Sequence, residues 1–332
     1  MSSSRHLTFA DPLPYQAALW ISEIDILPTE KGKFRAELAQ IHLDKVWMQR
    51  GHENLPQVVV GEVKPVRKAI TFLTSEQEMV YCGQQVLTGS IIVHRSGTQH
   101  RRNAANRHWG SMSLSHDDYH AACRAIAGFD ISDETSGLLV QPDPDVMSRL
   151  LEMHETVGTI AKTLPDIFAM PEVGRSLEQK LIHLMIRCLT DSVQSSTRVG
   201  GLRHDLIVAR FEEFLEVNPD QPLYLTEVCA AIGVAERTLR AACEDHIGMG
   251  PIRYLTLRRM HLVRRALLRA DPAQATVTQI ATNYGFWELG RFSVAYRALF
   301  GESPSDSLRL KFDERSVFVN RPSSLPGFAS RQ

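Results

Sequence analysis

Six arginines and no acidic residue lie in one predicted helix near the C-terminal end of the chain. The helix spans Ile252 to Ala270, between Pro251 and Pro272, and prolines at these places are typical helix boundaries. Its arginines are Arg253, Arg258, Arg259, Arg264, Arg265 and Arg269. Guanidinium groups bind nucleic-acid phosphates with an affinity that salt weakens and that carries no base preference. We therefore predict phosphate contacts for Arg258, Arg264 and Arg265.

This basic patch is local, because the chain as a whole is nearly neutral. Its 332 residues carry a formal net charge of −1, and a length of this order suggests two domains. The five cysteines are far apart and include no CxxC pair, which disfavours a zinc knuckle, a redox motif and a disulfide framework. The start lacks the apolar core of a signal peptide, and no run of about 18 apolar residues occurs. We expect a cytoplasmic protein with no membrane partner.

A helix, a glycine and a second helix precede the basic helix. The first is predicted over Thr226–Ile232 with Thr226 as its N-cap, Gly233 breaks it, and the second spans Glu236–His246. This order is the helix-turn-helix layout. The inward face of the second helix carries Leu239, Ala242 and Cys243. Its outward face offers Arg237, a forked donor of the kind that pairs with a guanine edge in a major groove.

The same layout follows the basic helix. A short helix over Val277–Tyr284 ends at Gly285, and a second helix runs from Glu288 to Phe300, where Gly301 stops it. The aromatic stripe of that helix predicts core packing, with an inward face of Leu289, Phe292, Tyr296, Leu299 and Phe300. The outward face is Trp287, Gly290, Arg291, Val294, Arg297 and Ala298. The basic helix between the motifs spans roughly 28 Å, so both second helices could enter successive major grooves, one DNA turn of about 34–36 Å apart.

The segments GVAERTLR, GMGPIRYL, LRRMHLVRRALL and ATNYGFWELGRFSVAYRALFGESPSDSLR together resemble the DNA-binding domain of the AraC/XylS family of transcriptional regulators. The resemblance covers residues 205–310, about a third of the chain. It implies a sequence-specific regulator of a metabolic operon that binds double-stranded DNA and contacts RNA polymerase. It also implies control by a small-molecule effector and a homodimer.

The resemblance also implies which residues meet DNA. In the first motif these are Glu236, Arg237, Arg240, Ala241 and Glu244. In the second motif they are Leu289, Gly290, Arg291, Val294 and Arg297. The second motif departs from the family pattern, because Val294 stands where a basic residue is frequent and Gly290 has no side chain. We expect it to read thymine methyl groups, or to hold mainly the DNA backbone through Arg291 and Arg297.

The N-terminal two thirds read differently. Residues 18–25, 37–43, 56–63, 68–73, 78–83 and 89–94 look like strands, and residues 145–165 and 176–194 like long helices. We therefore expect an α+β protein. Its parts are a β-rich, barrel-like sensing and dimerisation domain over 1–195, helical from 120, then a linker at 196–201, an all-α DNA-binding domain over 202–311 and a loose tail at 312–332. The two long helices are candidates for the dimer surface.

The effector is less well indicated. GFWELGRF and RRMHLVRRALL resemble the ethanolamine-utilisation regulators, whose inducer is a small amine with cobalamin, but no motif demonstrates either ligand. The main rival is a metal-dependent, cupin-like enzyme, which would need closely spaced histidines on a strand and a nearby carboxylate. His94 and His100 are six residues apart across a glycine-containing turn with no acid. A second rival, a helical adaptor for proteins alone, fits the basic helix poorly. We expect no catalytic residue, no metal and no resident cofactor.

Overall fold

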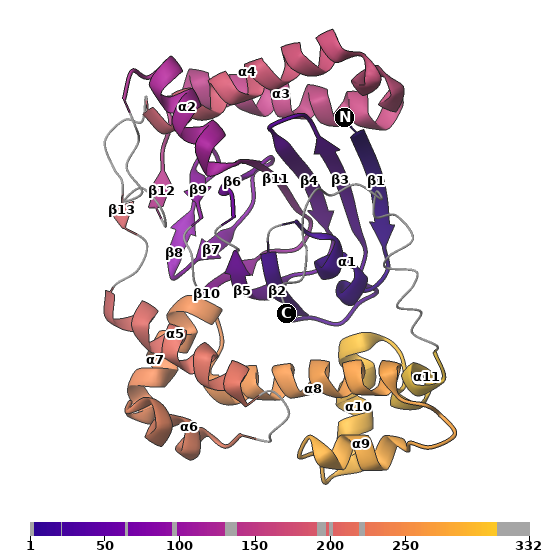
Figure 1. The fold of residues 1–332 in the computed structure, drawn as a ribbon. Helices are drawn as coiled ribbons and strands as arrows, with labels where there is room; N and C mark the ends of the chain where they lie inside the picture. Colours follow the sequence, from indigo (N-terminus) through magenta and orange to yellow (C-terminus); the bar gives the residue numbers. More distant parts are fainter. Residues whose placement is uncertain are drawn as a thin grey trace, which may run out of the picture.

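The computed structural model describes residues 3–20, 22–63, 66–94, 98–129, 138–190, 197–198, 202–218 and 223–310. A β-rich part with three long helices is followed by an all-helical part (Figure 1). This confirms the expected α+β class and the order of the two parts. None of the described helices is both long and apolar enough to cross a lipid bilayer.

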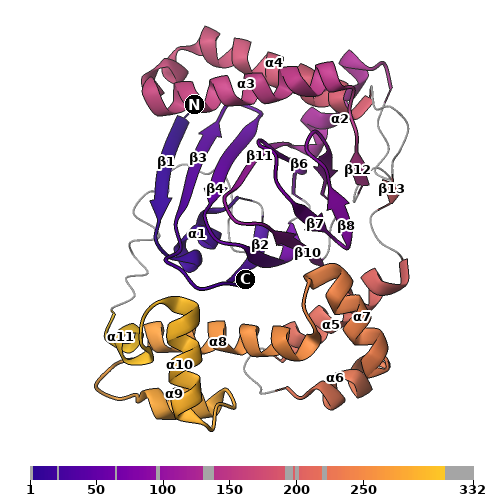
Figure 2. The same cartoon turned by 180° about the vertical axis from the view of Figure 1, so that it is seen from behind.

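Two antiparallel sheets form the β-rich part. Their strands are β1 (Ser3–Phe9), β2 (Ser22–Pro28), β3 (Ala36–His42), β4 (Trp47–Glu53), β5 (Gln57–Val63), β6 (Lys68–Leu73), β7 (Met79–Tyr81), β8 (Gln84–Val86), β9 (Ile91–Val93), β10 (Thr98–Asn103), β11 (Arg107–Leu114), β12 (Leu138–Val140) and β13 (Thr197–Arg198). One sheet has the order β1-β3-β4-β11-β6-β9-β12-β13, and the other has the order β2-β5-β10-β7-β8. The second sheet lies on the side of the helical C-terminal part (Figure 2).

Close packing between strands explains one glycine. Gly61 on β5 has a φ of +146°, and a Cβ atom there would lie 2.1 Å from the carbonyl oxygen of Glu23 on β2. Only a residue without a side chain permits this approach. Gly61 therefore allows β2 to pair closely with β5, with Ile24 opposite Gly61.

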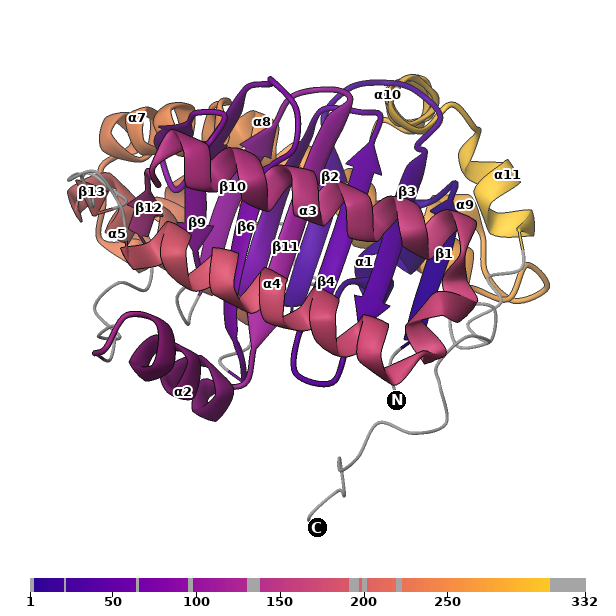
Figure 3. The same ribbon diagram turned by 90° about the horizontal axis from the view of Figure 1, so that it is seen from above.

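A helical layer covers one face of the eight-stranded sheet. It consists of α2 (His116–Ile126), α3 (Pro144–Thr163), a short 3₁₀ turn (Pro165–Ala169) and α4 (Pro171–Thr190). Figure 3 shows α3 and α4 lying across the strands. Met48, Phe72 and Met112 from the sheet pack against Leu150 and Met185 from this layer in one buried core, so apolar burial holds the layer in place.

The C-terminal part consists of helices only. They are α5 (Leu202–Val217), α6 (Leu225–Ile232), α7 (Glu236–Ile247), α8 (Pro251–Arg269), α9 (Val277–Asn283), α10 (Leu289–Phe300) and α11 (Pro304–Arg309). Leu27, Val58 and Val60 of the five-stranded sheet share a buried core with Val208 and Phe211 of α5. The two parts of the chain are therefore joined by apolar contact and not only by their covalent connection (Figures 1 and 2).

The structure differs from the sequence-based expectations at several places. The strand expected at 18–25 begins at Ser22, because α1 (Pro12–Ala18), capped by Asp11, occupies the preceding residues. The helix expected at 176–194 begins at Pro171, since proline is favourable in a first turn. Strands β1, β4, β10 and β11 were not predicted. Of the expected linker, the structure describes residues 197–198, which form strand β13 and pair with β12. The expected tail lies outside the described residues.

Candidate DNA-binding interface and internal cavity

The first helix-turn-helix unit is built from α6 and α7. Gly233 adopts a left-handed φ of +67° between them, a conformation that favours glycine. The buried apolar residues of the unit are Val228, Ile232, Leu239, Ala242, Cys243 and Ile247, and they share one core with residues of α5. The first helix begins at Leu225, before the expected cap Thr226, because the Glu227 carboxylate accepts a hydrogen bond from the Tyr224 backbone N–H at 3.1 Å.

The outer face of α7 carries the residues predicted to meet DNA. Glu236, Arg237, Arg240 and Glu244 are exposed, and Ala241 is half-buried. Arg240 donates to Glu236 one turn away, at 3.1 Å, so this arginine already has a surface partner of small energetic value. Arg237 is exposed. Its guanidinium group is therefore free to donate hydrogen bonds to an acceptor on a DNA base.

The second unit packs around the aromatic residues of α10. Thr276 caps α9, and its hydroxyl accepts a hydrogen bond from the Gln279 N–H at 3.2 Å. Phe292 and Tyr296 are 2% and 0% exposed, and the Tyr296 hydroxyl donates to the Ser307 hydroxyl of α11 at 2.7 Å. Gly301 has a φ of +74° at the end of α10. The aromatic stripe is thus core, in agreement with its helical spacing.

The outer face of α10 is half apolar and half basic. Gly290, Arg291, Val294 and Arg297 are exposed, and Leu289 is half-buried. Val294 is 72% exposed and Trp287, just before the helix, 70%. Arg291 lies 2.7 Å from Glu288. The exposed valine and tryptophan side chains can contact thymine methyl groups. The two arginines beside them can contact phosphates.

Two of the α8 arginines predicted to contact phosphates have carboxylate partners in this structure. Arg264 pairs with Asp11 of the N-terminal part, and its Nε lies 3.1 Å from Glu302. Arg265 pairs with Asp25. Burial disfavours the charge on Arg264, but Asp11 and Glu302 outweigh it and raise its pKa above the ordinary value. Both arginines therefore hold the joining helix on the N-terminal part in this arrangement, and a DNA phosphate would have to compete with these carboxylates for them.

Arg258 is placed differently from these two. It is half-buried, and its charge acts on the carboxyl groups of Glu212 and Glu216 of α5. The pKa of Glu212 is raised to about 7 by burial, against the opposing effect of Arg258. The structure thus brings the three predicted phosphate contacts onto one helix but gives each of them carboxyl neighbours.

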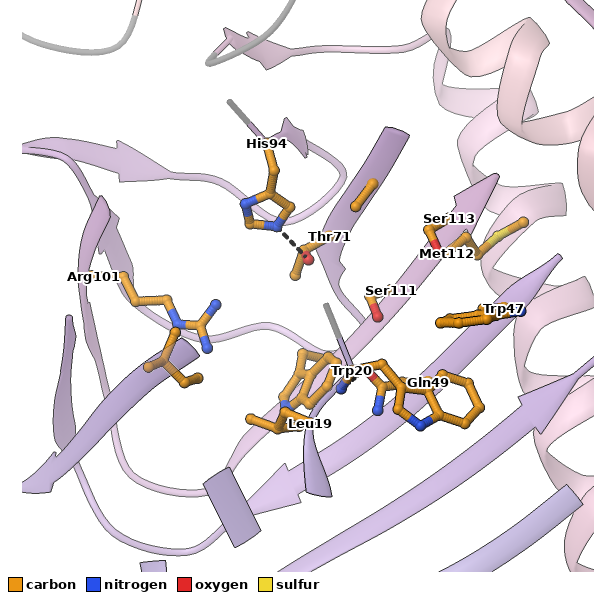
Figure 4. Close-up of a pocket in the computed structure, with 13 residues that line it drawn as sticks. Leu19, Trp20, Trp47, Gln49, Thr71, His94, Arg101, Ser111, Met112 and Ser113 are labelled. Carbon is orange, nitrogen blue, oxygen red and sulfur yellow. Dashed lines mark hydrogen bonds between the residues drawn. The ribbon is translucent and has the colours of Figure 1, made fainter. Parts of the chain in front are cut away.

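A small cavity of about 60 Å³ lies between the two sheets. Leu19, Trp20, Trp47, Trp109 and Met112 supply apolar walls, and polar groups come from Gln49, Thr71, His94, Arg101, Ser111 and Ser113 (Figure 4). The Trp20 and Trp47 rings lie 5.3 Å apart at a tilted angle. Flat indole surfaces with a few convergent polar groups are typical of a small-molecule site.

The two titratable side chains that line the cavity, His94 and Arg101, are neutral and positively charged, respectively, near pH 7. His94 bonds to Thr71 at 2.8 Å and to Gln99 at 2.9 Å. Burial lowers its pKa to about 4, although the bond to Gln99 opposes the shift, so it is neutral near pH 7. Burial and the charge of Arg107 lower the pKa of Arg101 to about 10, so this residue stays cationic. No carboxylate is among the described residues that line the cavity.

The nearest buried acid is already paired. Glu53 is 1% exposed and accepts hydrogen bonds from Arg107 at 3.0 Å, from the Trp109 indole N–H at 2.9 Å and from the Tyr15 hydroxyl. Arg101 Nε has no hydrogen-bond partner among the described residues. The region therefore holds the buried Arg107, the half-buried Arg101 and one buried carboxylate, and this excess of positive charge would favour an anion.

The cavity was not predicted from the sequence, because its residues come from six separate segments. The sequence did hold one indication of a cavity wall. In residues 107–114, RHWGSMSL, large and small side chains are interleaved, as in a strand with two different faces. A further group that was not predicted could hold a metal: Cys82, His100 and Asp205, where α5 approaches β10.

Known proteins resemble the C-terminal part most strongly. The family model described as "Helix-turn-helix domain" matches residues 228–309. The "Probable thc operon regulatory protein" of Rhodococcus erythropolis is 42% identical over 103 residues, 31% of each chain. The "XylDLEGF operon transcriptional activator 2" of Pseudomonas putida is 32% identical over 114 residues, which are 34% of this chain and 73% of that protein.

A longer match reaches beyond this unit. The "XylDLEGF operon transcriptional activator 3" of Pseudomonas putida is 35% identical over 170 residues, 51% of this chain and 50% of that protein. The match spans about a third of the Rhodococcus protein and half of activator 3. Of these three relatives, activator 2 is the one covered over more than two thirds of its length.

Proposed function

Since the chain belongs to the AraC/XylS family of transcriptional regulators, we propose that it binds a specific double-stranded DNA site through both helix-turn-helix units and regulates a metabolic operon. The observation that carries the proposal is the pair of exposed, arginine-bearing faces of α7 and α10, joined by the 19-residue helix α8. Arg237 on α7 would read a guanine. Val294 on α10 would meet a thymine methyl group, while Arg291 and Arg297 would hold phosphates.

Recovery of genomic DNA bound by the full-length protein tests this function. Fragments captured by the purified protein are sequenced, and the same experiment is run with Arg237→Ala. Enrichment of fragments upstream of one operon, lost in the variant, is the expected outcome. An unenriched, random set of fragments would contradict sequence-specific binding.

Replacing Arg237 with alanine is expected to weaken binding to the recovered site by about 1–3 kcal/mol and to relax base preference at one position. The physical reason is the loss of two forked hydrogen bonds to one base. Fluorescence anisotropy with a set of single-base operator variants measures both effects. Arg175→Ala, an exposed arginine of α4, is the matched control. An unchanged preference in Arg237→Ala would place the reading contact elsewhere.

The ion pairs of α8 suggest that the N-terminal part competes with DNA for arginines. We expect the double change Asp11→Asn and Asp25→Asn to release Arg265 and to leave Arg264 with Glu302 as its one carboxylate partner, while asparagine keeps the cap of α1. Each additional phosphate that these arginines neutralise would steepen the slope of log affinity against log salt by about 0.9. Binding at several salt concentrations measures this slope. Asp44→Asn with Asp117→Asn, two exposed acids, is the control, and an equal slope in both variants would contradict the competition.

We infer that the effector is a small organic anion, and that it binds in the cavity between the sheets. The volume of about 60 Å³ limits it to a few heavy atoms, and Arg101 favours a carboxylate or similar group. A protonated amine such as ethanolamine would instead meet Arg101 with no lining carboxylate to compensate it, and cobalamin far exceeds the cavity. The charge of the site therefore disfavours the resemblance-based lead.

The change Arg101→Gln is expected to weaken binding of a small aliphatic carboxylate by about 1.5–3 kcal/mol, because a hydrogen-bonded charge is lost. Quenching of tryptophan fluorescence follows the binding, since Trp20 and Trp47 line the cavity. The control is Arg35→Gln, an exposed arginine before β3. Tighter binding of ethanolamine than of any carboxylate by the unaltered protein would overturn the inference.

The remaining partners follow from family membership and stay proposals. A homodimer through the outer faces of α3 and α4, contact with RNA polymerase, and no catalytic role fit the proposed regulator. A groove on that layer, lined by Met153, Thr156, His183 and Leu184 among others, lies on the proposed dimer surface. The rival metal-dependent enzyme has no support in the cavity, whose described lining holds a single histidine and no acid.

A further inference from the structure

Three residues with metal-binding side chains meet at the junction of the two parts of the chain. Cys82 lies in the turn between β7 and β8, His100 on β10, and Asp205 in the first turn of α5. One ligand atom from each residue lies within 4.8 Å of those of the other two. Cys82, His100 and Asp205 are 0%, 2% and 8% exposed, respectively, so the three residues are buried.

A fourth candidate ligand comes from α7. His246 is 3% exposed, and its Nδ1 lies 2.7 Å from Nε2 of His100. The ring packs directly on the turn that carries Cys82, because a Cβ atom at Gly83 would lie 2.6 Å from His246 Nε2. Two of the four residues therefore belong to the β-rich part and two to the part with the helix-turn-helix units.

The backbone at Cys82 is unusual for its residue type. Cys82 has a φ of +46° and Gly83 a φ of +78°, a combination that hairpin turns reach most easily with asparagine and glycine. The Cys82 N–H donates to the His100 carbonyl at 2.9 Å, which holds the thiol beside that strand. A cysteine kept in a left-handed conformation at a buried junction indicates a use for its side chain rather than for its backbone.

We propose that Cys82, His100, Asp205 and His246 bind one divalent transition-metal ion of the Zn²⁺ class, which fastens the first helix-turn-helix unit to the β-rich part. One thiolate, two imidazoles and one carboxylate form a four-coordinate set that suits Zn²⁺. The Cys82 thiol loses its proton on binding. The two imidazole nitrogens, now hydrogen-bonded, would separate to about 3.3 Å, the spacing set by Zn–N bonds of about 2.0–2.1 Å in a tetrahedron.

If the chain binds DNA as proposed, the ion would influence that binding through the position of α7. His246 and Asp205 flank the packing of α7 on α5, and α7 is the helix that bears Arg237. Bound metal would therefore fix the position of the first recognition helix relative to the cavity. The alternative is that the four side chains form only a hydrogen-bonded contact between the two parts, and the experiment separates these outcomes.

Metal content of the full-length protein tests the proposal without using DNA. The protein is incubated with Zn²⁺, freed of excess ion, and analysed for zinc; a parallel sample with Co²⁺ is examined for thiolate-to-cobalt absorption. We expect about one ion per chain, and a fall to less than about a tenth of that in Cys82→Ser and in Asp205→Asn. Cys229→Ser, a half-buried cysteine of α6, should retain the full content and the absorption.

The two variants carry one change on each side of the junction, so misfolding of one leaves the other informative. If Cys82→Ser does not fold by circular dichroism, Asp205→Asn and His246→Asn decide. No ion in the unaltered protein, or full content in the folded variants, would overturn the proposal and leave a hydrogen-bonded contact. DNA recovery by the metal-free protein is measured separately, so failure of the metal site and failure of DNA binding are distinguishable.

Discussion

Replacing Glu53 with alanine is expected to lower the free energy of unfolding by about 3–5 kcal/mol, because it leaves the buried Arg107 without its counter-charge. Arg107 is 1% exposed, and its Nη1 lies 3.0 Å from Glu53 Oε2. Tyr15 and Trp109 would also lose their acceptor. Chemical denaturation followed by circular dichroism measures the change.

The matched control is Glu37→Ala on the adjacent strand β3. Glu37 is largely exposed and lies 3.8 Å from His6, so its loss should change the free energy of unfolding by no more than about 0.5 kcal/mol. The joint change Glu53→Leu and Arg107→Met should cost less than Glu53→Ala, because no isolated charge remains. Equal losses for Glu53→Ala and Glu37→Ala would show that the buried pair has no structural role.

The change Phe292→Ala is expected to destabilise the second helix-turn-helix unit by about 3–5 kcal/mol, the usual cost of removing a buried phenylalanine. The ring contacts Phe286 and Tyr296 at centroid distances of 5.0 and 5.5 Å. Because this unit has only a small core around α9 and α10, a loss of this size would largely unfold it. Hydrogen exchange of the α10 amides detects such local unfolding.

Val294→Ala serves as the control for Phe292→Ala on the same helix, since Val294 is 72% exposed. It should leave hydrogen exchange unchanged while weakening contact with one thymine. Protection of the α6 and α7 amides should persist in Phe292→Ala, because the first unit has its own core. Loss of protection in both units together would mean that they fold as one cooperative block.

The helical C-terminal part could be predicted from the sequence because its signals are local. Gly233, Thr276 and Gly301 mark helix ends through their own backbone preferences or side-chain hydrogen bonds, and the structure has helix ends at all three. The spacing of Phe292 and Tyr296 was enough to assign them to the core. The exposed positions of Arg237 and Arg297 follow from the same periodicity.

The β-rich part and the contacts between the parts could be predicted less well. Strand β10 looked like a turn because its sequence, TQHRRN, is entirely polar, whereas its pairing with β5 and β7 comes from distant segments. Asp25, the partner of Arg265, lies 240 residues earlier in the chain, and Asp11, one partner of Arg264, lies in the same N-terminal segment, so no local pattern predicts these pairs. The Cys82–His100–Asp205 group is likewise assembled by the fold alone, which is why a search for closely spaced histidines did not find it.

The most direct test of DNA reading by both units is an interference footprint of the full-length protein on its recovered site, with guanine N7 methylation reporting guanine contacts and replacement of thymine by uracil reporting thymine-methyl contacts. We predict interference at major-groove positions in two patches on one face of the duplex, separated by about 10–10.5 base pairs. The patch lost in Arg237→Ala should be the one bound by α7, and the other should remain. A single patch would contradict binding through two helix-turn-helix units.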